Sequence, residues 1–167
     1  MDSNTILVSR DGYLTFHNKK YLCSIGANGI TQNKQEGDKS TPEGCFPIRY
    51  VLYRPDKIQS LDTKIPIVAL EENDGWCDDV SANEYNTHIK APFNSSYEKM
   101  WREDNLYDIV VVLGYNDDPV VAGKGSAIFM HVARENYSPT DGCIGLSKSD
   151  LLEILHDVDT TTQVCVR

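Results

Sequence analysis

Two residues near the C-terminal end of the chain have the types and the spacing of a thiol nucleophile and its base. His131 ends an apolar stretch, and Cys143 follows twelve residues later, after a polar loop that contains Pro139. Only a thiolate attacks a carbonyl efficiently, and a free thiol with a pKa of about 8.5 is mostly protonated at neutral pH. A neighbouring imidazole takes that proton or stabilises the ion pair. The pair predicts cysteine-dependent acyl transfer, with Cys143 as nucleophile and His131 as general base.

A glycine directly before the cysteine fits this chemistry. Gly142 gives the backbone the freedom to present Cys143 together with backbone N–H groups. Amides placed in this way stabilise the oxyanion of a tetrahedral intermediate. A cysteine and a histidine at this spacing are also compatible with a buried thiol and a structural histidine. The pair by itself therefore leaves both interpretations open.

The other four cysteines form no recognisable pattern. The total of five is odd, and the sequence contains no Cys-x-x-Cys pair. This count argues against a disulfide scaffold and against a zinc ribbon. Each of the four is interpreted as a small buried hydrophobic residue; they are Cys23, Cys45, Cys77 and Cys165.

Mainly β-structure must position the candidate pair. Apolar, β-branched runs alternate with turn signals such as Asp11-Gly12, a pattern typical of short strands joined by hairpins. Residues 126–132 are predicted to form a buried strand that ends close to His131. The other strands are expected at residues 5–9, 13–17, 21–25, 46–53, 65–70, 107–115 and 163–166, with a turn at 18–20.

Edges and loops of the sheet are predicted from proline and from polar composition. Pro47 indicates that the 46–53 strand begins at a sheet edge, because proline has no N–H to donate to a second neighbour. Residues 163–166 are expected to add a final edge strand. Polar composition predicts loops at 26–44 and at 71–81, the latter acidic.

Helical signals are few. Residues 147–158 are predicted as a helix, since Ser147 and Asp150 form a capping box ahead of an apolar stripe. Residues 96–103 are predicted as one or two further helical turns. The stripe consists of Leu151, Ile154, Leu155 and Val158.

Length and charge restrict the class of protein. A chain of 167 residues with 40% hydrophobic content is expected to form one domain around one core. The net charge of −9 argues against nucleic acid and against an anionic membrane surface as partners, because both require clustered Lys and Arg. No run approaches the roughly 18 consecutive apolar residues of a membrane span, so no membrane insertion is expected.

Several further blocks accompany the Cys–His pair in a fixed order. They are GD at 37–38, TPEGCFPI at 41–48, DGWCDD at 74–79, YN at 85–86, WR at 101–102, YD at 107–108, GSAIFMHVAR at 125–134 and TDGC at 140–143. Together they resemble the YkuD-type L,D-transpeptidase catalytic domain, in its branch with a Thr-acidic-Gly-Cys signature. The resemblance covers nearly the whole chain, and it implies one catalytic domain over residues 1–167.

One difference from the commoner signature of that family affects the base. The commoner form has Ser-His-Gly-Cys, whereas this chain has Thr140 and Asp141 before Gly142 and Cys143. A second histidine beside the thiol is therefore missing, and His131 is left as the candidate base. Asp141 either orients a donor or a substrate amine, or only shapes the turn.

The resemblance implies a mainly β, L,D-transpeptidase-like sandwich or sheet with one or two short helices, and a specific reaction. Cys143 would attack the carbonyl of the third residue in a peptidoglycan stem tetrapeptide, and D-alanine would leave with a proton from His131. An amine of a neighbouring stem or water would then resolve the thioester, giving a cross-link or L,D-carboxypeptidase activity. No metal or organic cofactor is needed. Arg134, Asn86 and Arg102 match recurring family positions, and each either binds substrate or makes a structural contact.

Two other functions and the location remain open from the sequence. The same pair is compatible with a cysteine hydrolase of another amide or ester, and the fold with a non-catalytic binding module. The family implies the periplasm or cell envelope, yet residues 1–10 lack the basic and apolar regions of a secretory signal. Removal of a leader, signal-less export and a cytosolic role in muropeptide processing are the three explanations. Oligomeric state is not predicted.

Overall fold

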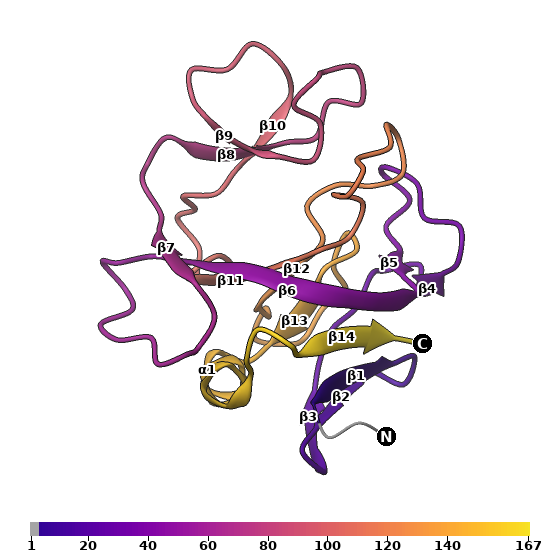
Figure 1. Ribbon diagram of the computed structural model, residues 1–167, viewed down its shortest axis with the longest axis vertical. Helices are drawn as coiled ribbons and strands as arrows, with labels where there is room; N and C mark the ends of the chain where they lie inside the picture. The colour runs from indigo at the N-terminus through magenta and orange to yellow at the C-terminus, as the bar shows by residue number, and fades with distance from the viewer. Residues whose placement is uncertain (1–3) are drawn as a thin grey trace.

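A computed structural model describes residues 4–167, which are mainly β-structure, with 36% strand and 6% helix (Figure 1). The large sheet has the strand order β13-β12-β11-β6-β14-β1-β2-β3, with β7 beside β6. The mainly β prediction is therefore confirmed. Its strands are β1 (Thr5–Ser9), β2 (Tyr13–Phe16), β3 (Lys19–Leu22), β6 (Gly44–Tyr53), β7 (Ile67–Ala69), β11 (Ile109–Leu113), β12 (Phe129–Val132), β13 (Ile144–Leu146) and β14 (Gln163–Val166).

The large sheet curves until its two ends meet. Ser24, two residues after β3, forms an antiparallel bridge with Gly145 of β13. The two residues exchange N–H···O bonds of 2.9 and 3.0 Å. A Cβ at position 145 would lie 2.3 Å from the Ser24 Oγ, so this close approach requires glycine. The result is a barrel-like sheet, and its interior holds the larger hydrophobic core, which includes Ile6, Leu14, Val111, Met130 and Val164.

The single helix of the described residues is α1 (Lys148–Asp157). Ser147 is its N-cap, and the Ser147 Oγ accepts a hydrogen bond of 3.2 Å from the Asp150 N–H, as the sequence predicts. Leu151, Ile154 and Leu155 are fully buried against the core. Within residues 4–167, no helix is long and apolar enough to cross a membrane.

A small three-stranded sheet stands apart from the large one in Figure 1. It consists of β8 (Asp74–Cys77), β9 (His88–Lys90) and β10 (Tyr97–Lys99), in the order β10-β8-β9. Two predictions were wrong here: the 71–81 loop contains a buried strand, and the 96–103 segment forms a strand instead of helical turns. Both segments owe their conformation to pairing with each other, a contact that local composition does not reveal.

A second hydrophobic cluster, distinct from the main core, contains Trp76 of the small sheet, Leu52 and Phe129 of the large one, and Tyr107. The indole ring of Trp76 packs edge-on against Phe129, with ring centroids 5.0 Å apart. This packing fixes the small sheet over the β11–β12 region. A side chain that projects from the small sheet can therefore reach the residues that follow β12.

Both predicted edge strands lie inside the sheet. Strand β6 is flanked by β11 and β14, and β14 by β6 and β1. Pro47 is tolerated because the β6–β11 register shifts next to it, where Ile48 and Tyr50 pair with consecutive residues of β11. The predicted 26–44 loop also contains two short strands, β4 (Ile30–Thr31) and β5 (Thr41–Pro42).

The second hairpin is tighter than predicted. His17 and Asn18 have φ values of 47° and 63°, the backbone of a two-residue turn, and β3 begins at residue 19. The predicted turn at 18–20 therefore lies one to two residues too late.

A disulfide joins Cys45 and Cys165, and this corrects the prediction that both are buried hydrophobic residues. They lie directly opposite each other in the β6–β14 pairing, although 120 residues separate them in the sequence. The cysteine count does not reveal this pair, because the two cysteines meet only through the pairing of β6 with β14, which are far apart in the sequence. Cys23 and Cys77 are buried free thiols, as predicted.

Candidate active site

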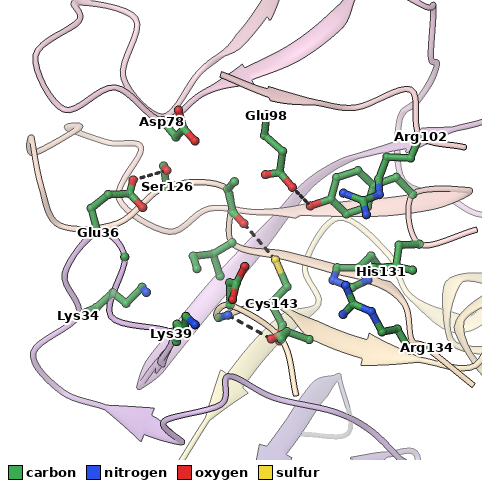
Figure 2. Close-up of a pocket in the computed structure, with 18 residues that line it drawn as sticks. Lys34, Glu36, Lys39, Asp78, Glu98, Arg102, Ser126, His131, Arg134 and Cys143 are labelled. Atoms are coloured by element: carbon green, nitrogen blue, oxygen red, sulfur yellow. Dashed lines mark hydrogen bonds between the residues drawn. The ribbon is translucent and has the colours of Figure 1, made fainter. Parts of the chain in front are cut away.

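Cys143 and His131 line the same cavity, which has a volume of about 460 Å³ (Figure 2). His131 lies in β12, and Cys143 directly precedes β13. The two strands pair in parallel, with His131 opposite Gly145. The intervening loop therefore returns the chain to the same end of the sheet. Cys143 is two residues before Gly145, so its thiol lies on the same face of the sheet as the His131 imidazole.

The turn before Cys143 is fixed by Thr140 and Gly142. The Thr140 Oγ1 donates a hydrogen bond of 2.6 Å to the Cys143 carbonyl and accepts one of 3.1 Å from the Gly142 N–H. Gly142 has a φ of +142°, and a Cβ there would lie 2.8 Å from the Ser40 carbonyl oxygen. Both the backbone conformation and the available space require glycine at this position.

The thiol of Cys143 is partly buried and held by backbone groups. Its Sγ donates to the Ala127 carbonyl oxygen at 3.1 Å and accepts from the Phe129 N–H at 3.4 Å. Burial, followed by the negative charge of Glu98, raises the pKa of the Cys143 thiol to about 12. In the free protein Cys143 is therefore a protonated thiol at neutral pH.

His131 is only 4% exposed, and its ring orientation is fixed. Its Nδ1 lies 2.9 Å from the Val132 carbonyl oxygen, which can only accept, so Nδ1 carries the hydrogen. Nε2 is left with the basic lone pair. Burial, assisted by the positive charges of Arg102 and Arg134, lowers the pKa of His131 to about 4. The imidazole is neutral at pH 7 and able to accept a proton.

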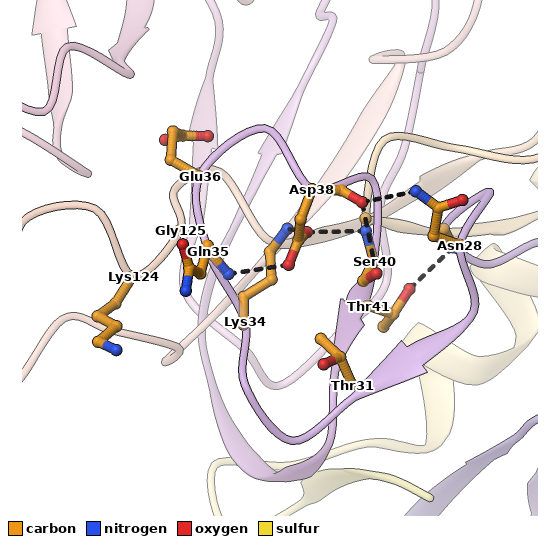
Figure 3. A network of polar contacts seen from close by, with 12 residues as sticks. Asn28, Thr31, Lys34, Gln35, Glu36, Asp38, Ser40, Thr41, Lys124 and Gly125 are labelled. Atoms are coloured by element: carbon orange, nitrogen blue, oxygen red, sulfur yellow. Dashed lines mark hydrogen bonds and ion pairs between the residues drawn. The ribbon is translucent and has the colours of Figure 1, made fainter.

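Lys34 lines the cavity on the side of Cys143 away from His131 (Figure 2), and Figure 3 shows its side chain beside Asp38. Its side chain is only 5% exposed, and its Nζ binds the Asp38 Oδ1 at 2.5 Å. Asp38 also accepts bonds of 2.9 Å from the Gln35 and Ser40 N–H groups. Although burial opposes it, these bonds hold the pKa of Asp38 below its usual value. The Lys34 ammonium is thereby fixed 3.4 Å from where a Cβ of Gly142 would be.

Glu98 extends into the cavity from β10 of the small sheet. It is partly buried, and its Oε1 accepts a hydrogen bond from the Tyr107 hydroxyl. The Tyr107 ring in turn packs edge-on against His131, with ring centroids 5.4 Å apart. Sequence reasoning missed both Lys34 and Glu98. The GD block at 37–38 was the nearest sequence motif to Lys34. Glu98 lies in the 96–103 segment, which was incorrectly predicted as helical.

Three of the four predicted substrate-binding residues line the cavity: Arg134, Arg102 and Asp141. Arg134 is exposed, and within residues 4–167 its guanidinium makes no hydrogen bond or ion pair. Arg102 instead forms a two-pronged ion pair with Asp104, at 2.8 and 2.6 Å. Asp141 is exposed beside the nucleophile.

Asn86, the fourth predicted substrate-binding residue, does not line this cavity. It is 6% exposed, and its Oδ1 accepts bonds of 3.0 Å from both the Trp76 Nε1 and the Ala127 N–H. Its Nδ2 donates to the carbonyls of Tyr115 and Asn116. Asn86 therefore fixes the backbone at Ala127 through the N–H group of that residue. The carbonyl of the same residue accepts the bond from the Cys143 thiol.

Among residues 4–167, no group of three or more His, Cys, Asp or Glu side chains is placed to hold a metal ion. The cavity brings together a thiol and an imidazole, with cations and four carboxylates, those of Glu36, Asp78, Glu98 and Asp141, around them.

Comparison with known proteins gives a family match and distant structural similarities. The family model of the L,D-transpeptidase catalytic domain (YkuD) matches residues 3–166. An L,D-transpeptidase from Mycobacterium smegmatis is 12% identical with a TM-score of 0.46, and L,D-transpeptidase 3 from Mycobacterium tuberculosis is 11% identical with a TM-score of 0.48. The helical cell shape determining protein Pgp2 from Campylobacter jejuni is 14% identical, also with a TM-score of 0.48.

The similarities involve nearly the whole of this chain but only part of the solved ones. They cover 99%, 99% and 100% of this chain and 58%, 61% and 52% of the three structures, in the same order. No curated protein sequence matches the chain.

Proposed function

Because the chain belongs to the L,D-transpeptidase catalytic-domain family, we propose that it is a cysteine-dependent L,D-transpeptidase acting on peptidoglycan stem tetrapeptides. The observation that carries the proposal is the common cavity of Cys143 and His131, within a family match that spans residues 3–166. On this view residues 1–167 form one catalytic domain, with stem peptides as donor and acceptor.

In the acylation step, the Cys143 Sγ attacks the carbonyl carbon of the third stem residue while its proton passes to the His131 Nε2. The Lys34 ammonium, next to Gly142, stabilises the negative charge that develops on the carbonyl oxygen. His131 then protonates the departing nitrogen of D-alanine, and the C–N bond breaks. The product is a thioester on Cys143 and free D-alanine. The chain's own residues supply every proton in this step.

The second step transfers the acyl group from Cys143 to an acceptor. An amine of a neighbouring stem gives a cross-link, and water gives a shortened stem, the product of L,D-carboxypeptidase activity. In both cases His131 assists by removing a proton from the attacking group and returning it to the sulfur.

The remaining residues of the cavity bind or position. Arg134, with its unpaired guanidinium, offers two parallel N–H donors to a substrate carboxylate. Arg102, fixed by Asp104, and the exposed Asp141 contact other polar groups of the stem. Asn86 acts indirectly, because its Oδ1 holds the Ala127 N–H and thereby the backbone of the residue whose carbonyl accepts the bond from the resting thiol.

The Cys45–Cys165 disulfide supports a cell-envelope location. Disulfides form and persist in oxidising compartments and are rare in the cytosol. Peptidoglycan cross-links are made outside the cytoplasmic membrane, so the proposed substrate and the proposed location agree.

Covalent labelling tests the proposal. A carbapenem, whose strained lactam amide accepts the same thiolate attack, is expected to add once to the wild-type protein in intact-mass measurement. Cys143→Ala should abolish the adduct, and Cys77→Ala, which removes a buried free thiol, should retain it. Disaccharide tetrapeptide should then yield dimer or tripeptide with loss of D-alanine. Selective alkylation of Cys143 by iodoacetamide, with neither carbapenem adduct nor tetrapeptide turnover, would instead indicate a hydrolase of another amide.

A further inference from the structure

The second half-reaction has a proton requirement that depends on the acceptor. A stem amine arrives mostly as an ammonium group at neutral pH, because aliphatic amines have pKa values well above 7. It must lose one proton before it can attack and a second one to become an amide nitrogen. Water loses only one proton during attack. His131 accepts one proton at a time, so it suffices for water and leaves one ammonium proton without an acceptor.

Glu98 lies where that acceptor is needed. It comes from β10, on the side of the cavity formed by the small sheet, whereas Cys143 and His131 come from the large one. Figure 2 shows the Glu98 carboxylate directed toward the sulfur of Cys143. After burial, the charge of Glu98 is the largest influence that raises the pKa of the thiol, which indicates that the two groups are close.

One oxygen of the Glu98 carboxylate accepts a hydrogen bond, and the other accepts none from the described residues. Oε1 accepts from the Tyr107 hydroxyl, and within residues 4–167 Oε2 makes no hydrogen bond or ion pair. Arg102 is a nearby cation, but Asp104 holds its guanidinium in a two-pronged pair. The second oxygen of Glu98 is therefore left without a fixed counter-ion.

The other carboxylates near Glu98 are placed differently. Asp78 accepts a bond of 2.6 Å from the Ser96 Oγ. Asp141 lies beside the nucleophile and is exposed to solvent. Burial raises the pKa of Glu98, the Tyr107 hydrogen bond and the charge of Arg102 partly offset this, and the charges of Asp78 and Asp141 add to the rise. The raised pKa favours a carboxylate that can take up a proton.

We infer that Glu98 binds the ammonium group of the acceptor stem and accepts its first proton, so that it determines the use of an amine instead of water. The inference rests on the proposed function. The ammonium transfers one proton to Glu98, and the neutral amine nitrogen attacks the thioester carbonyl. The nitrogen loses its second proton to His131, the C–S bond breaks, and His131 returns that proton to the Cys143 sulfur. The proton on Glu98 passes to solvent, and the balance is one amide, one thiol and one released proton.

The ratio of cross-linked dimer to hydrolysed tripeptide formed from the acyl-enzyme tests this role. Wild type and Glu98→Gln are incubated with disaccharide tetrapeptide at pH 7, and mass spectrometry measures dimer, tripeptide and released D-alanine. The dimer-to-tripeptide ratio of Glu98→Gln is expected to fall about 100-fold, the typical contribution of a positioned base. Carbapenem should still add to Glu98→Gln, which shows that the variant folds. Because removal of the Glu98 charge alters the pKa of the Cys143 thiol, the readout is the product ratio, which does not depend on the acylation rate. The matched control is Glu103→Gln, which makes the same charge change at an exposed residue outside the cavity and should keep the wild-type ratio.

A neutral acceptor separates proton removal from a structural effect. Hydroxylamine is largely unprotonated at pH 7, so it needs no base for its first proton. Glu98→Gln should therefore keep the wild-type hydroxamate-to-tripeptide ratio while its dimer-to-tripeptide ratio falls. An unchanged dimer-to-tripeptide ratio, an equal loss of hydroxamate and dimer, or a wild type that only hydrolyses would each overturn the inference and leave the proposed function intact. Absence of any acyl-enzyme in wild type would overturn the proposed function itself.

Discussion

The disulfide between Cys45 and Cys165 should make a large contribution to the free energy of unfolding. The perturbation is the double substitution Cys45→Ala and Cys165→Ala. The bond joins positions 120 residues apart, so it closes a loop that includes most of the chain. In the chain-entropy relation, a loop of this length restricts the unfolded state by about 5 kcal/mol. Because native disulfides often contribute less, the expected loss in the free energy of unfolding is about 2–5 kcal/mol.

The native fold should survive this change. Strand β14 keeps its backbone hydrogen bonds to β1 and β6 on both sides, and Val164 and Val166 stay buried in the core. The substitution therefore acts mainly on the unfolded chain, which becomes more expanded. Urea unfolding should show a lower midpoint together with a steeper dependence on urea, since the slope reflects the surface exposed on unfolding.

The control uses the same two proteins with and without dithiothreitol. The reductant should lower the urea midpoint of wild type and leave that of the double variant unchanged, because the variant has no disulfide to lose. Equal midpoints for oxidised wild type and the double variant would refute the reasoning. An equal decrease of the urea midpoint in both proteins on addition of dithiothreitol would also refute it, because the reductant would then act on something other than this disulfide.

Three further predictions concern the site. Gly142→Ala should lower the free energy of unfolding by about 1–3 kcal/mol and slow carbapenem acylation, because it strains the backbone and brings a Cβ to 2.8 Å from the Ser40 carbonyl; urea unfolding and intact mass measure these effects. Iodoacetamide alkylation of Cys143 should rise about tenfold per pH unit up to pH 10, since only the thiolate reacts and burial raises its pKa to about 12; a plateau below pH 9 would contradict this. Asp38→Asn should destabilise the protein at pH 7. Hydrogen bonds hold the folded pKa of Asp38 below its unfolded value of about 4, so in urea unfolding the difference from wild type should disappear as pH falls from 4 through the folded value.

The parts of the fold that the sequence predicts are those with local signals. Strand β1 and helix α1 follow from an apolar run before Asp11-Gly12 and from the Ser147 cap, and the structure places both within one residue of the prediction. The β8–β10 pairing and the interior position of β14 depend on partners far away in the sequence. Residues 97–99 have no strong preference of their own, so their partner decides their conformation.

The candidate site divides in the same way. His131, Cys143 and Gly142 lie in one continuous segment whose motif is readable, and the structure brings them together. Lys34 and Glu98 come from a loop and from the small sheet, and only the tertiary fold places them at the cavity. A single charged residue in a polar segment carries no signal of its own, because most such residues are solvated surface groups.

The resting state of the pair follows from the cost of burying charge. A thiolate and an imidazolium inside the cavity would each lose solvation, and their mutual attraction offsets that loss only with good geometry and further hydrogen bonds. In the free protein the Phe129 N–H is the one hydrogen-bond donor to the sulfur among the described residues, the Cys143 thiol donates to the Ala127 carbonyl, and burial lowers the pKa of His131 to about 4. Both groups are therefore neutral at rest. In the proposed acylation, the electron pair of the sulfur attacks the carbonyl carbon, and negative charge develops on the carbonyl oxygen beside the fixed Lys34 ammonium. Proton transfer to His131 should then accompany attack instead of preceding it, and the site should react faster with a bound amide than its thiol reactivity in the absence of substrate suggests.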